Sequence, residues 1–505
     1  MLWDSRRRII MLFNSYLFLL CFLPLSLAGY FLCNARKKYE WGKIWLTGMS
    51  LWFYAYFNVR YLLIIMGSIL FNYFLYRILT GRWEAYSRHR KYLTAIGIFA
   101  NLGVLFYYKY YDFFLENMNT AFHLNLPLRQ VLLPLGISFF TFQQVGFLVD
   151  SYRGETKGYS FLDYALFVTF FPQLVAGPIV THDEMIEQFA DLQKKTFCPA
   201  NAAKGLYAFA QGLAKKILVA DIFGKAVSFG FGRLETLNGL AAVWMMVCYM
   251  VQLYFDFSGY CDMARGIGFM FNIEIPVNFF SPYKAVNLVD FWKRWHITLT
   301  RFFTRYLYIP LGGNRKGTLR TSFNMLMVYL FSGIWHGSGW TFFCWGALHG
   351  IGYVLTRRLL KKIEKIPKII THFFSLAFWG VSLIFFRAES MEQAAAVIEQ
   401  IFCGGYALSR IPAALLQQFR TPEFFYIFKL LRLDRILPGG VSGCDLLLSA
   451  LYMGIAWMML LCCKNVSEKT ESFCPTKKNG LWTAFLLLWS LVSLSEVSSF
   501  LYFNF

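Results

Sequence analysis

The fold is decided by residues 321–356, which read TSFNMLMVYLFSGIWHGSGWTFFCWGALHGIGYVLT. Two apolar runs, 321–335 and 341–356, flank the polar turn His336-Gly337-Ser338-Gly339. Basic connections precede and follow this stretch, and an excess of Lys and Arg is typical of the cytoplasmic side of a membrane. We therefore expect the two runs to form a helical hairpin that leaves the cytoplasmic face and returns to it, with His336 at the turn.

The arms of this predicted hairpin are short. Each has about sixteen residues, which at the helical rise gives roughly 24 Å, less than the usual hydrocarbon thickness of about 30 Å. We therefore expect the turn below the outer surface, with His336 at the bottom of an extracytoplasmic funnel. The cations before the hairpin are Lys284, Lys293, Arg294, Arg301, Arg305, Arg315, Lys316 and Arg320, and those after it are Arg357, Arg358, Lys361, Lys362, Lys365 and Lys368.

The whole composition agrees with a membrane protein. Apolar residues make up 57% of the 505, charged residues 15% and aromatic residues 20%, a balance outside that of soluble domains. The net charge of +21 favours basic cytoplasmic loops over nucleic-acid binding. We expect an all-α polytopic fold with one continuous membrane domain over residues 1–505 and about eleven or twelve spans. The predicted spans are 9–33, 44–57, 61–79, 92–115, 161–180, 205–231, 237–257, 321–335, 341–356, 370–386, 446–463 and 481–503.

Several segments qualify this pattern. The run 131–149 contains Pro134 and Gly136 and is either a short span or a re-entrant segment buried in protein. The first run follows Arg6-Arg7-Arg8 and is too long for a signal peptide, so we expect it to be retained. The eleven cysteines are scattered without a metal-type or disulfide pattern, and we expect no metal site.

The basic clusters also predict the remaining topology. Arg36-Lys37-Lys38 and the group Arg82, Arg88, Arg90 and Lys91 are separated by two apolar segments, so both are expected in the cytoplasm and the N-terminus outside, against the pull of Arg6 to Arg8. The same reasoning places an insertion at about 387–445 on the extracytoplasmic side. It contains the amphipathic run 391–402 and the break Pro438-Gly439-Gly440, and it is either an interfacial cap on the membrane domain or a docking surface.

Two of the seven histidines stand in unusual settings, His296 in FWKRWH and His336 in GIWHGSG. Histidine exchanges protons near neutral pH, and burying it in a membrane domain without a task or a partner is costly. The alternative is that each is a satisfied helix-packing residue. His349 lies among small residues in GALHG, and we expect it to be structural. For Asp256, Asp262 and Arg265 we expect a buried ion pair or a hydrogen-bonded helix contact rather than direct catalysis.

Ordered blocks through most of the chain resemble the signature of the membrane-bound O-acyltransferase family. The blocks are FWKRWHITL at 291–299, YLYIPLGGNR at 306–315, GIWHG at 333–337, VAGPI at 175–179 and YFDFSGY at 254–260, with an aromatic C-terminal end. They are most similar to the branch of the alginate O-acetyltransferase membrane subunit and its peptidoglycan-acetylating relatives. The resemblance implies a ring of tilted helices around a thinned centre, which an acyl donor reaches from the cytoplasm and an acceptor from outside. It also implies that His336 is the catalytic histidine and His296 a second catalytic histidine on the cytoplasmic side.

This chemistry predicts roles for further residues. His336 as general base accepts a proton from a hydroxyl that attacks an activated acyl carbonyl. Cationic side chains, Arg294, Arg301, Arg305 and Arg315, either attract phosphates of coenzyme A or of a carrier's phosphopantetheine, or serve only as positive-inside residues. The candidate substrate- or tunnel-lining residues are Trp292, Arg294, Trp295, Arg305, Asn314, Trp335 and Asp256.

The predicted function is transfer of an acyl group, which the resemblance implies is acetyl, from a cytoplasmic thioester to an extracytoplasmic polysaccharide or partner protein. Expected partners are an exported esterase-like acetyltransferase, a cell-envelope polysaccharide and membrane lipid, and the expected location is the bacterial cytoplasmic membrane. Two alternatives stay open: D-alanyl transfer to teichoic acid from a carrier protein, and a transporter that moves an activated sugar or lipid.

Overall fold

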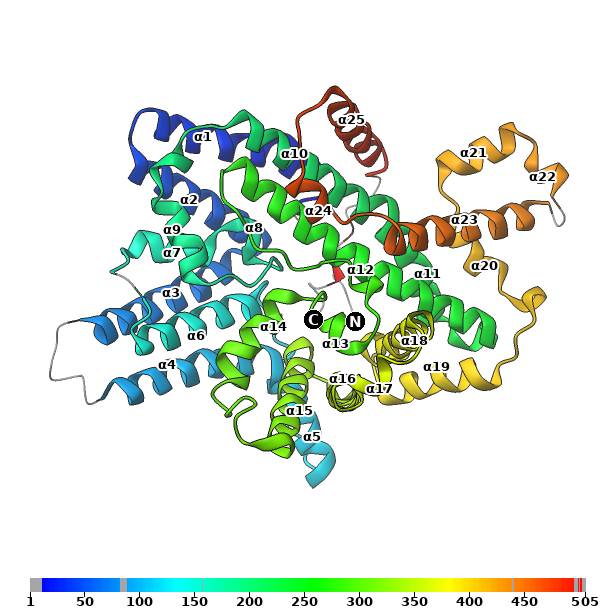
Figure 1. Ribbon diagram of the computed structural model, residues 1–505, viewed down its shortest axis with the longest axis horizontal. Helices are drawn as coiled ribbons and strands as arrows, with labels where there is room; N and C mark the ends of the chain where they lie inside the picture. Colours follow the sequence, from blue (N-terminus) through cyan, green and yellow to red (C-terminus); the bar gives the residue numbers. More distant parts are fainter. Residues whose placement is uncertain are drawn as a thin grey trace. The chain divides into compact units, whose positions relative to one another are not determined.

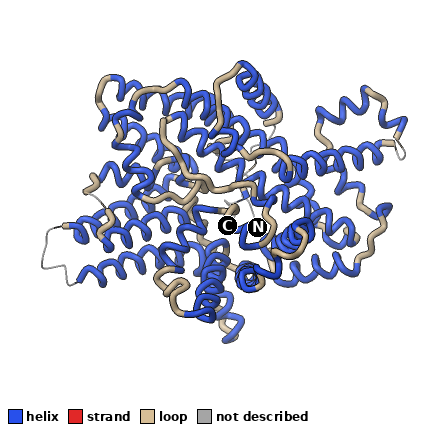
Figure 2. The backbone as a smooth tube through the Cα atoms, viewed as in Figure 1, coloured by secondary structure: helices blue, strands red, loops and turns tan. Residues whose placement is uncertain are grey.

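The computed structural model describes residues 11–81, 89–156, 158–437, 440–494, 498, 500 and 501. Several features of the sequence lie outside these residues: the Arg6 to Arg8 run, Arg82, Arg88, the Pro438-Gly439 break and the last four aromatic-rich positions, 502–505. Within the described ranges the chain forms helices joined by loops and turns, and it contains no strand there (Figure 2). The all-α prediction is confirmed.

Five described helical segments are long and apolar enough to cross a membrane. They are Phe18–Ala35, Val59–Thr80, Gly239–Met270, Lys368–Arg387 and Val441–Leu461. The other predicted spans coincide with helices that are shorter, more polar or interrupted, such as α4 (Arg90–Leu105), which continues through a π-helical turn into α5 (Tyr111–Phe122). The total of about eleven or twelve spans stays a prediction.

The chain divides into two compact units, the first formed by Met1–Leu213, Tyr260–Val277 and Thr470–Phe505, the second by Ala214–Gly259 and Asn278–Lys469. Helix α12 (Gly239–Met270) contributes to both. The further helices of the first unit (Figure 1) are α1 (Leu23–Ala35), α2 (Tyr39–Phe57), α3 (Val59–Thr80), α4, α5, α6 (Ile137–Arg153), α7 (Phe161–Thr169), α8 (Phe171–Leu174), α9 (His182–Ala190), α10 (Pro199–Ala214) and α25 (Lys477–Val492).

Buried amides hold the core of the first unit together. Asn72 of α3 donates to Asn101 of α4 at 3.0 Å and to Gln144 of α6 at 2.9 Å. Polar side chains commonly join helices in this way inside a membrane domain. Helix α6, the segment for which a re-entrant form was one expectation, is preceded by Gly136 with φ +70°, and a Cβ there would lie 2.6 Å from the Leu174 carbonyl oxygen. Most of α6 is buried, so this segment is enclosed by protein.

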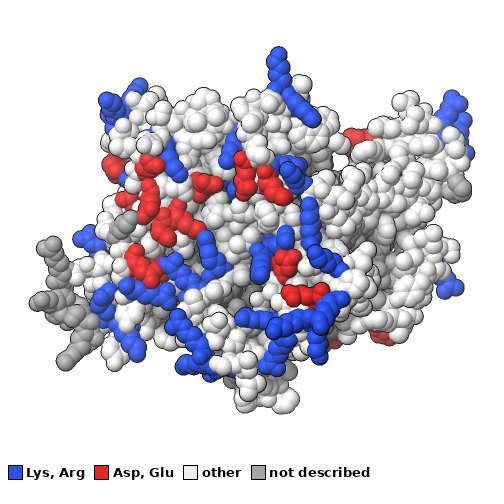
Figure 3. All heavy atoms as spheres, viewed as in Figure 1, with Lys and Arg blue, Asp and Glu red and all other residues white. Residues whose placement is uncertain are grey.

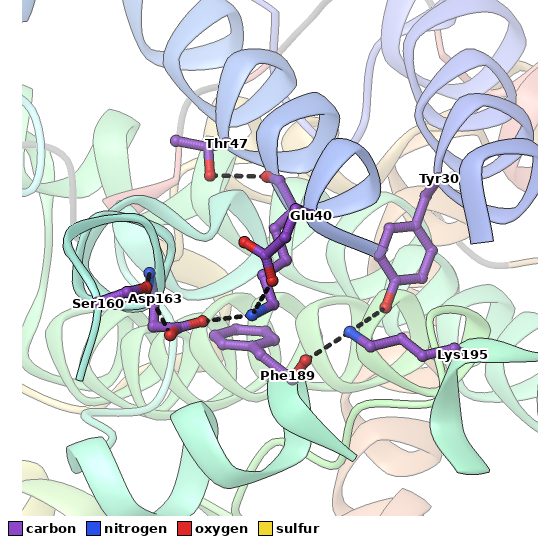
Figure 4. Close-up of polar contacts among 8 residues, drawn as sticks. Tyr30, Glu40, Thr47, Ser160, Asp163, Phe189 and Lys195 are labelled. Carbon is purple, nitrogen blue, oxygen red and sulfur yellow. Dashed lines mark hydrogen bonds and ion pairs between the residues drawn. The ribbon is translucent and has the colours of Figure 1, made fainter. Parts of the chain in front are cut away.

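A second group of polar contacts joins residues from five elements of the first unit (Figure 4). The Lys43 ammonium of α2 lies 2.7 Å from the Asp163 carboxylate of α7 and 3.0 Å from Glu40. Lys195, which ends a short 3-10 helix, donates to the Phe189 carbonyl and, at 3.4 Å, to the Tyr30 hydroxyl. Both lysines are largely buried, and these partners offset the cost of removing their charges from water.

The second unit contains the predicted hairpin. Its helices besides α12 are α11 (Asp221–Gly232), α13 (Leu288–Trp292), α14 (Ile297–Phe303), α15 (Gly317–His336), α16 (Trp340–Arg358), α17 (Leu360–Ile363), α18 (Lys368–Arg387), α19 (Met391–Cys403), α20 (Ala413–Leu416), α21 (Pro422–Leu430), α22 (Leu433–Ile436) and α23 (Val441–Leu461). Helices α15 and α16 pack through glycines: a Cβ on Gly333 would lie 2.3 Å from the Phe342 carbonyl oxygen, and one on Gly346 would lie 2.6 Å from that of Tyr329. This contact admits no larger residue without a shift.

The hairpin is confirmed, but its predicted arm length is wrong. Helix α15 has 20 residues and α16 has 19, so each is roughly 30 Å long at the helical rise. The apolar run starts at Thr321, whereas the helix already starts at Gly317 and includes Arg320. Arm length therefore gives no reason for a sunken turn, and the depth of His336 stays a prediction.

The insertion at 387–445 packs on its own unit. The predicted amphipathic run forms α19, with Ala394 and Val397 fully buried. Helix α20 packs against α11 and α23, and Arg420 forms a bidentate ion pair with Asp445 at 2.7 and 3.0 Å. These contacts favour the interpretation of this segment as a cap.

Candidate active site

His296 lies in the turn between α13 and α14, in a left-handed conformation with φ +46°. Its ring is fully buried, and Nδ1 lies 3.1 Å from the Asn278 side-chain oxygen, which also accepts from the Thr298 hydroxyl at 2.9 Å. An amide oxygen only accepts, so Nδ1 carries the hydrogen and Nε2 of the neutral ring keeps its lone pair. Burial lowers the pKa of His296 to about 3, and the ring is neutral at physiological pH.

His336 is the last residue of α15 and is 3% exposed. Its ring contacts three aromatic side chains, with centroid distances of 4.9 Å to Trp335, 5.3 Å to Trp345 and 5.2 Å to Phe386. The His336 and His296 ring centroids lie 6.3 Å apart. The two histidines predicted from separate sequence blocks therefore occupy one buried aromatic shell.

The three predicted tryptophans form part of this shell. Trp335 lies 6.1 Å from the His296 ring. Trp292 contacts Trp345 at 6.0 Å, and Trp295 packs at 4.9 Å against Phe279, a ring that lies 6.4 Å from His296. All three are at least nine-tenths buried. The structure therefore brings these tryptophans and both histidines together.

His349 is bonded into the helix packing. Its Nε2 lies 2.9 Å from the Ser382 hydroxyl of α18, and its ring contacts Trp292 and Trp345 at 5.2 and 4.8 Å. This arrangement agrees with the predicted structural role. The ring supports two tryptophans of the shell from outside.

Asp256 belongs to a buried ion cluster. The Lys216 ammonium lies 2.6 Å from Asp256 and 2.8 Å from Asp221. The next residue, Phe257, presents its ring edge to His296 at a centroid distance of 5.0 Å. A structural ion pair was the expectation for Asp256, and its partner proves to be Lys216, which the sequence did not single out. In the first unit, Arg265 donates to the Ile275 carbonyl at 3.1 Å.

The remaining predicted residues lie towards the surface. Arg294 pairs with Asp290 at 2.9 Å one helical turn away. Asn314 is exposed on a loop that Asn324 holds by donating to the Gly313 carbonyl at 2.9 Å. Arg305 is half-buried and stacks over Tyr306 at 5.5 Å. Of these residues, Arg305 lines a groove.

This groove has a volume of about 490 Å³, and its lining residue Ile297 directly follows His296 in the chain, although His296 itself does not line it. Three cationic, three apolar and two threonine side chains line it, a combination that suits a ligand with a charged end and an apolar arm. His336 is not among its lining residues. The lining residues are Trp292, Lys293, Ile297, Thr300, Arg301, Thr304, Arg305 and Ile309.

Sequence reasoning missed several residues of this site. Asn278, Trp345 and Phe386 contact the histidines directly but stand outside the quoted blocks or on another helix. Sequence spacing alone does not predict that Asn278, in a loop, contacts His296, which lies in a turn 18 residues later. Among the described residues, no three His, Cys, Asp or Glu side chains gather in an arrangement that holds a metal ion.

Comparison with known proteins identifies relatives. The sequence profile of the membrane-bound O-acyltransferase family matches residues 53–385. A peptidoglycan O-acetyltransferase of Helicobacter pylori is 39% identical over an alignment that covers 99% of this chain and 98% of the relative. A probable alginate O-acetylase of Pseudomonas aeruginosa is 35% identical, covering 80% and 78%. A teichoic acid D-alanyltransferase of Streptococcus thermophilus is 27% identical, covering 46% and 59%.

Proposed function

This chain belongs to the membrane-bound O-acyltransferase family and is an O-acyltransferase, and we propose that it passes an acetyl group from a cytoplasmic thioester to an extracytoplasmic acceptor with His336 as general base. The observation that carries this proposal is the pair of imidazoles 6.3 Å apart inside one aromatic shell. Two imidazoles that close give a transferring proton one acceptor, His336, and a second polar ring beside it, His296.

The proposed reaction is direct transfer. The acceptor oxygen attacks the thioester carbonyl carbon while His336 takes the hydroxyl proton, the carbon–sulfur bond breaks, and His336 returns the proton to the leaving sulfur. General-base help of this kind contributes roughly a hundred- to ten-thousand-fold in rate. His296, fixed as the Nδ1–H tautomer by Asn278, carries an Nε2 that accepts hydrogen bonds rather than donating them.

The aromatic shell supports this chemistry. Trp335, Trp345 and Phe386 surround the His336 ring at 4.9 to 5.3 Å. Such a shell keeps bulk water away from the thioester, which otherwise hydrolyses, and it strengthens electrostatic interactions inside the site. We assign these residues to water exclusion and to the orientation of the base.

The groove beside His296 is the proposed entry of the donor. Lys293, Arg301 and Arg305 offer charge to the phosphates of coenzyme A or of a carrier-bound phosphopantetheine, while Ile297 and Ile309 line it with apolar surface. The proposed cytoplasmic position of this groove rests on the positive-inside rule. The chain would then sit in a bacterial cytoplasmic membrane.

The acceptor is proposed from the relatives. The nearly full-length match to the peptidoglycan O-acetyltransferase favours a cell-envelope polysaccharide, reached directly or through an exported esterase-like acetyltransferase. D-alanyl transfer to teichoic acid is the second candidate, and the match to such an enzyme covers less than half of this chain. Envelope analysis distinguishes the two, because it reports the acyl group and the acceptor together.

The test is mass spectrometry of envelope polysaccharides from cells that express the wild-type chain, His336→Asn or His123→Asn. His123 is exposed and has a left-handed φ of +52°, which Asn tolerates, so it is a matched control. We expect acetylated glycan with the wild type and with H123N, and none with H336N at equal abundance in the membrane. Wild-type acetylation in H336N would contradict the proposal and favour a transporter.

A further inference from the structure

A short connection between two long helices of the second unit carries an unusual density of charge. Helix α16 ends at Arg358 and α18 begins at Lys368, with α17 between them. Every cation here is exposed, and the connection contains a single acid, Glu364. The six cations are Arg357, Arg358, Lys361, Lys362, Lys365 and Lys368.

These charges are not compensated within the described part of the protein. Arg358 donates to the Ser322 hydroxyl of α15 at 2.9 Å, and Arg357 lies 3.8 Å from the Met325 sulfur. Neither contact supplies a negative charge, and no described carboxylate pairs with any of the six. Arg320, one turn into α15, adds a further exposed cation. Figure 3 shows cations gathered over this part of the surface.

Apolar side chains are exposed among the cations. Leu359 is 44% exposed, Ile366 is 42% exposed and Ile369 is 78% exposed. A fully hydrated loop gains nothing from presenting these side chains to water. Interleaved Lys, Arg and large aliphatic residues are typical of a segment that lies in the headgroup layer of a membrane.

The position of the connection fits that layer. Helix α18 is long and apolar enough to cross a membrane, so the charged turn directly before it lies where the span leaves the hydrocarbon. Anionic headgroups attract basic segments at this depth by about 1 kcal/mol per cation, which is roughly a fivefold gain in affinity for each.

We propose that Arg320 and the six cations form a binding site for an acidic phospholipid, with phosphate on the cations and acyl chains beside Ile366 and Ile369. Arg357 and Arg358 of α16 are held in place by contacts with α15, so part of the site is formed before the lipid binds. The same two helices carry His336 at their far end. Bound lipid therefore holds the basic end of the α15–α16 hairpin in place. If the proposed function holds, it also sets how deep in the membrane His336, the proton acceptor, lies.

The experiment uses the full chain in nanodiscs of phosphatidylcholine, with or without phosphatidylglycerol. Hydrogen exchange is followed by mass spectrometry in peptides covering 357–370. Phosphatidylglycerol is expected to slow exchange in this segment. The apparent affinity of the protein for phosphatidylglycerol should fall roughly a hundredfold in the triple variant Lys361→Gln, Lys362→Gln, Lys365→Gln. The matched control, Lys464→Gln, Lys477→Gln, Lys478→Gln, removes three exposed lysines elsewhere and should respond as the wild type does.

Three results would overturn the proposal. One is exchange that does not depend on phosphatidylglycerol. Another is equal protection by coenzyme A in phosphatidylcholine discs, which would assign the cations to a free phosphate ligand. The third is a triple variant that behaves as the wild type. If the ligand of this segment is an acidic carrier protein and not a lipid, phosphatidylglycerol will have no effect on exchange, which is the first of these results. The readout needs no acetyl transfer, so it stands apart from the test of the proposed function.

Discussion

The His296 and His336 rings lie 6.3 Å apart, yet they are held by different means. His336 ends a long helix and is surrounded by aromatic rings, whereas His296 sits in a tight turn and is fixed by the Asn278 side chain. One ring thus depends on helix packing, the other on a hydrogen bond. The two attachments respond differently to substitution.

Replacement of His336 tests the proposed base directly. With purified protein in detergent or nanodiscs, His336→Asn is expected to lower kcat by roughly a hundred- to ten-thousand-fold, because the general base is lost. KM for the donor should change little, because the donor groove does not include this residue. A variant whose KM rises while kcat is unchanged would show that His336 binds substrate instead.

Asn278→Asp tests the neutral state of His296. The wild-type pKa of about 3 means that this ring does not titrate in the physiological range. A carboxylate at 278 stabilises the imidazolium and raises the pKa of His296. If the reaction needs the neutral ring, the activity of N278D is lost as the pH falls through the raised pKa of His296. The wild type remains active at that pH. Thr298→Val removes another donor to Asn278 without adding charge and should leave the kcat–pH profile in place.

The groove cations predict a donor effect. Arg301→Gln and Arg305→Gln should each raise KM for acetyl-coenzyme A roughly ten- to hundredfold with kcat unchanged, since a charge-assisted hydrogen bond is worth about 1.5 to 3 kcal/mol. Lys464→Gln, outside the groove, is the control. Equal KM values in all three variants would show that these arginines do not bind the donor and serve only as positive-inside residues.

The glycine contact of the hairpin predicts a stability effect. Gly333→Ala places a methyl group 2.3 Å from the Phe342 carbonyl oxygen, so α15 and α16 must separate and His336 must shift. We expect a lower Tm and lower activity. Gly454→Ala is the matched control, because nothing lies within 4 Å of its Cβ position and Ala favours a helix by about 1 kcal/mol over Gly. Thermal unfolding in detergent measures both, and a G333A protein as stable as G454A would show that the contact relaxes freely.

Lys195 predicts a pH-dependent stability. Burial, aided by the nearby charge of Lys43, lowers the pKa of Lys195 from 10.5 to about 8. Between these values the unfolded chain binds more protons than the folded one, so stability should rise with pH across this window. Lys195→Met removes the titrating group, and its Tm should lose that rise when scanned from neutral to alkaline pH. An identical slope in wild type and variant would assign the effect to another group.

The sequence predicted the helical class, the hairpin and the members of the aromatic shell that lie inside the quoted blocks, because local apolar runs and polar turns determine these features. It did not predict Asn278 or Phe386 as neighbours of the histidines, since these contacts depend on how distant segments pack. The length of α15 was also missed. A helix continues through Arg320 when its charged end reaches an interface, whereas an apolar-run criterion stops at the first charge.

The buried cluster of Lys216 with Asp221 and Asp256 has an evolutionary consequence. Loss of the lysine alone would leave the buried Asp256 carboxylate without its counter-charge, and loss of that acid would weaken what holds the ammonium there. Substitutions of these residues in homologous proteins should therefore be correlated. Apolar replacements should arise together or pass through an intermediate that tolerates an unpaired buried charge. Drift at 216 and 256 should be coupled, while the exposed cations of the surface vary one at a time.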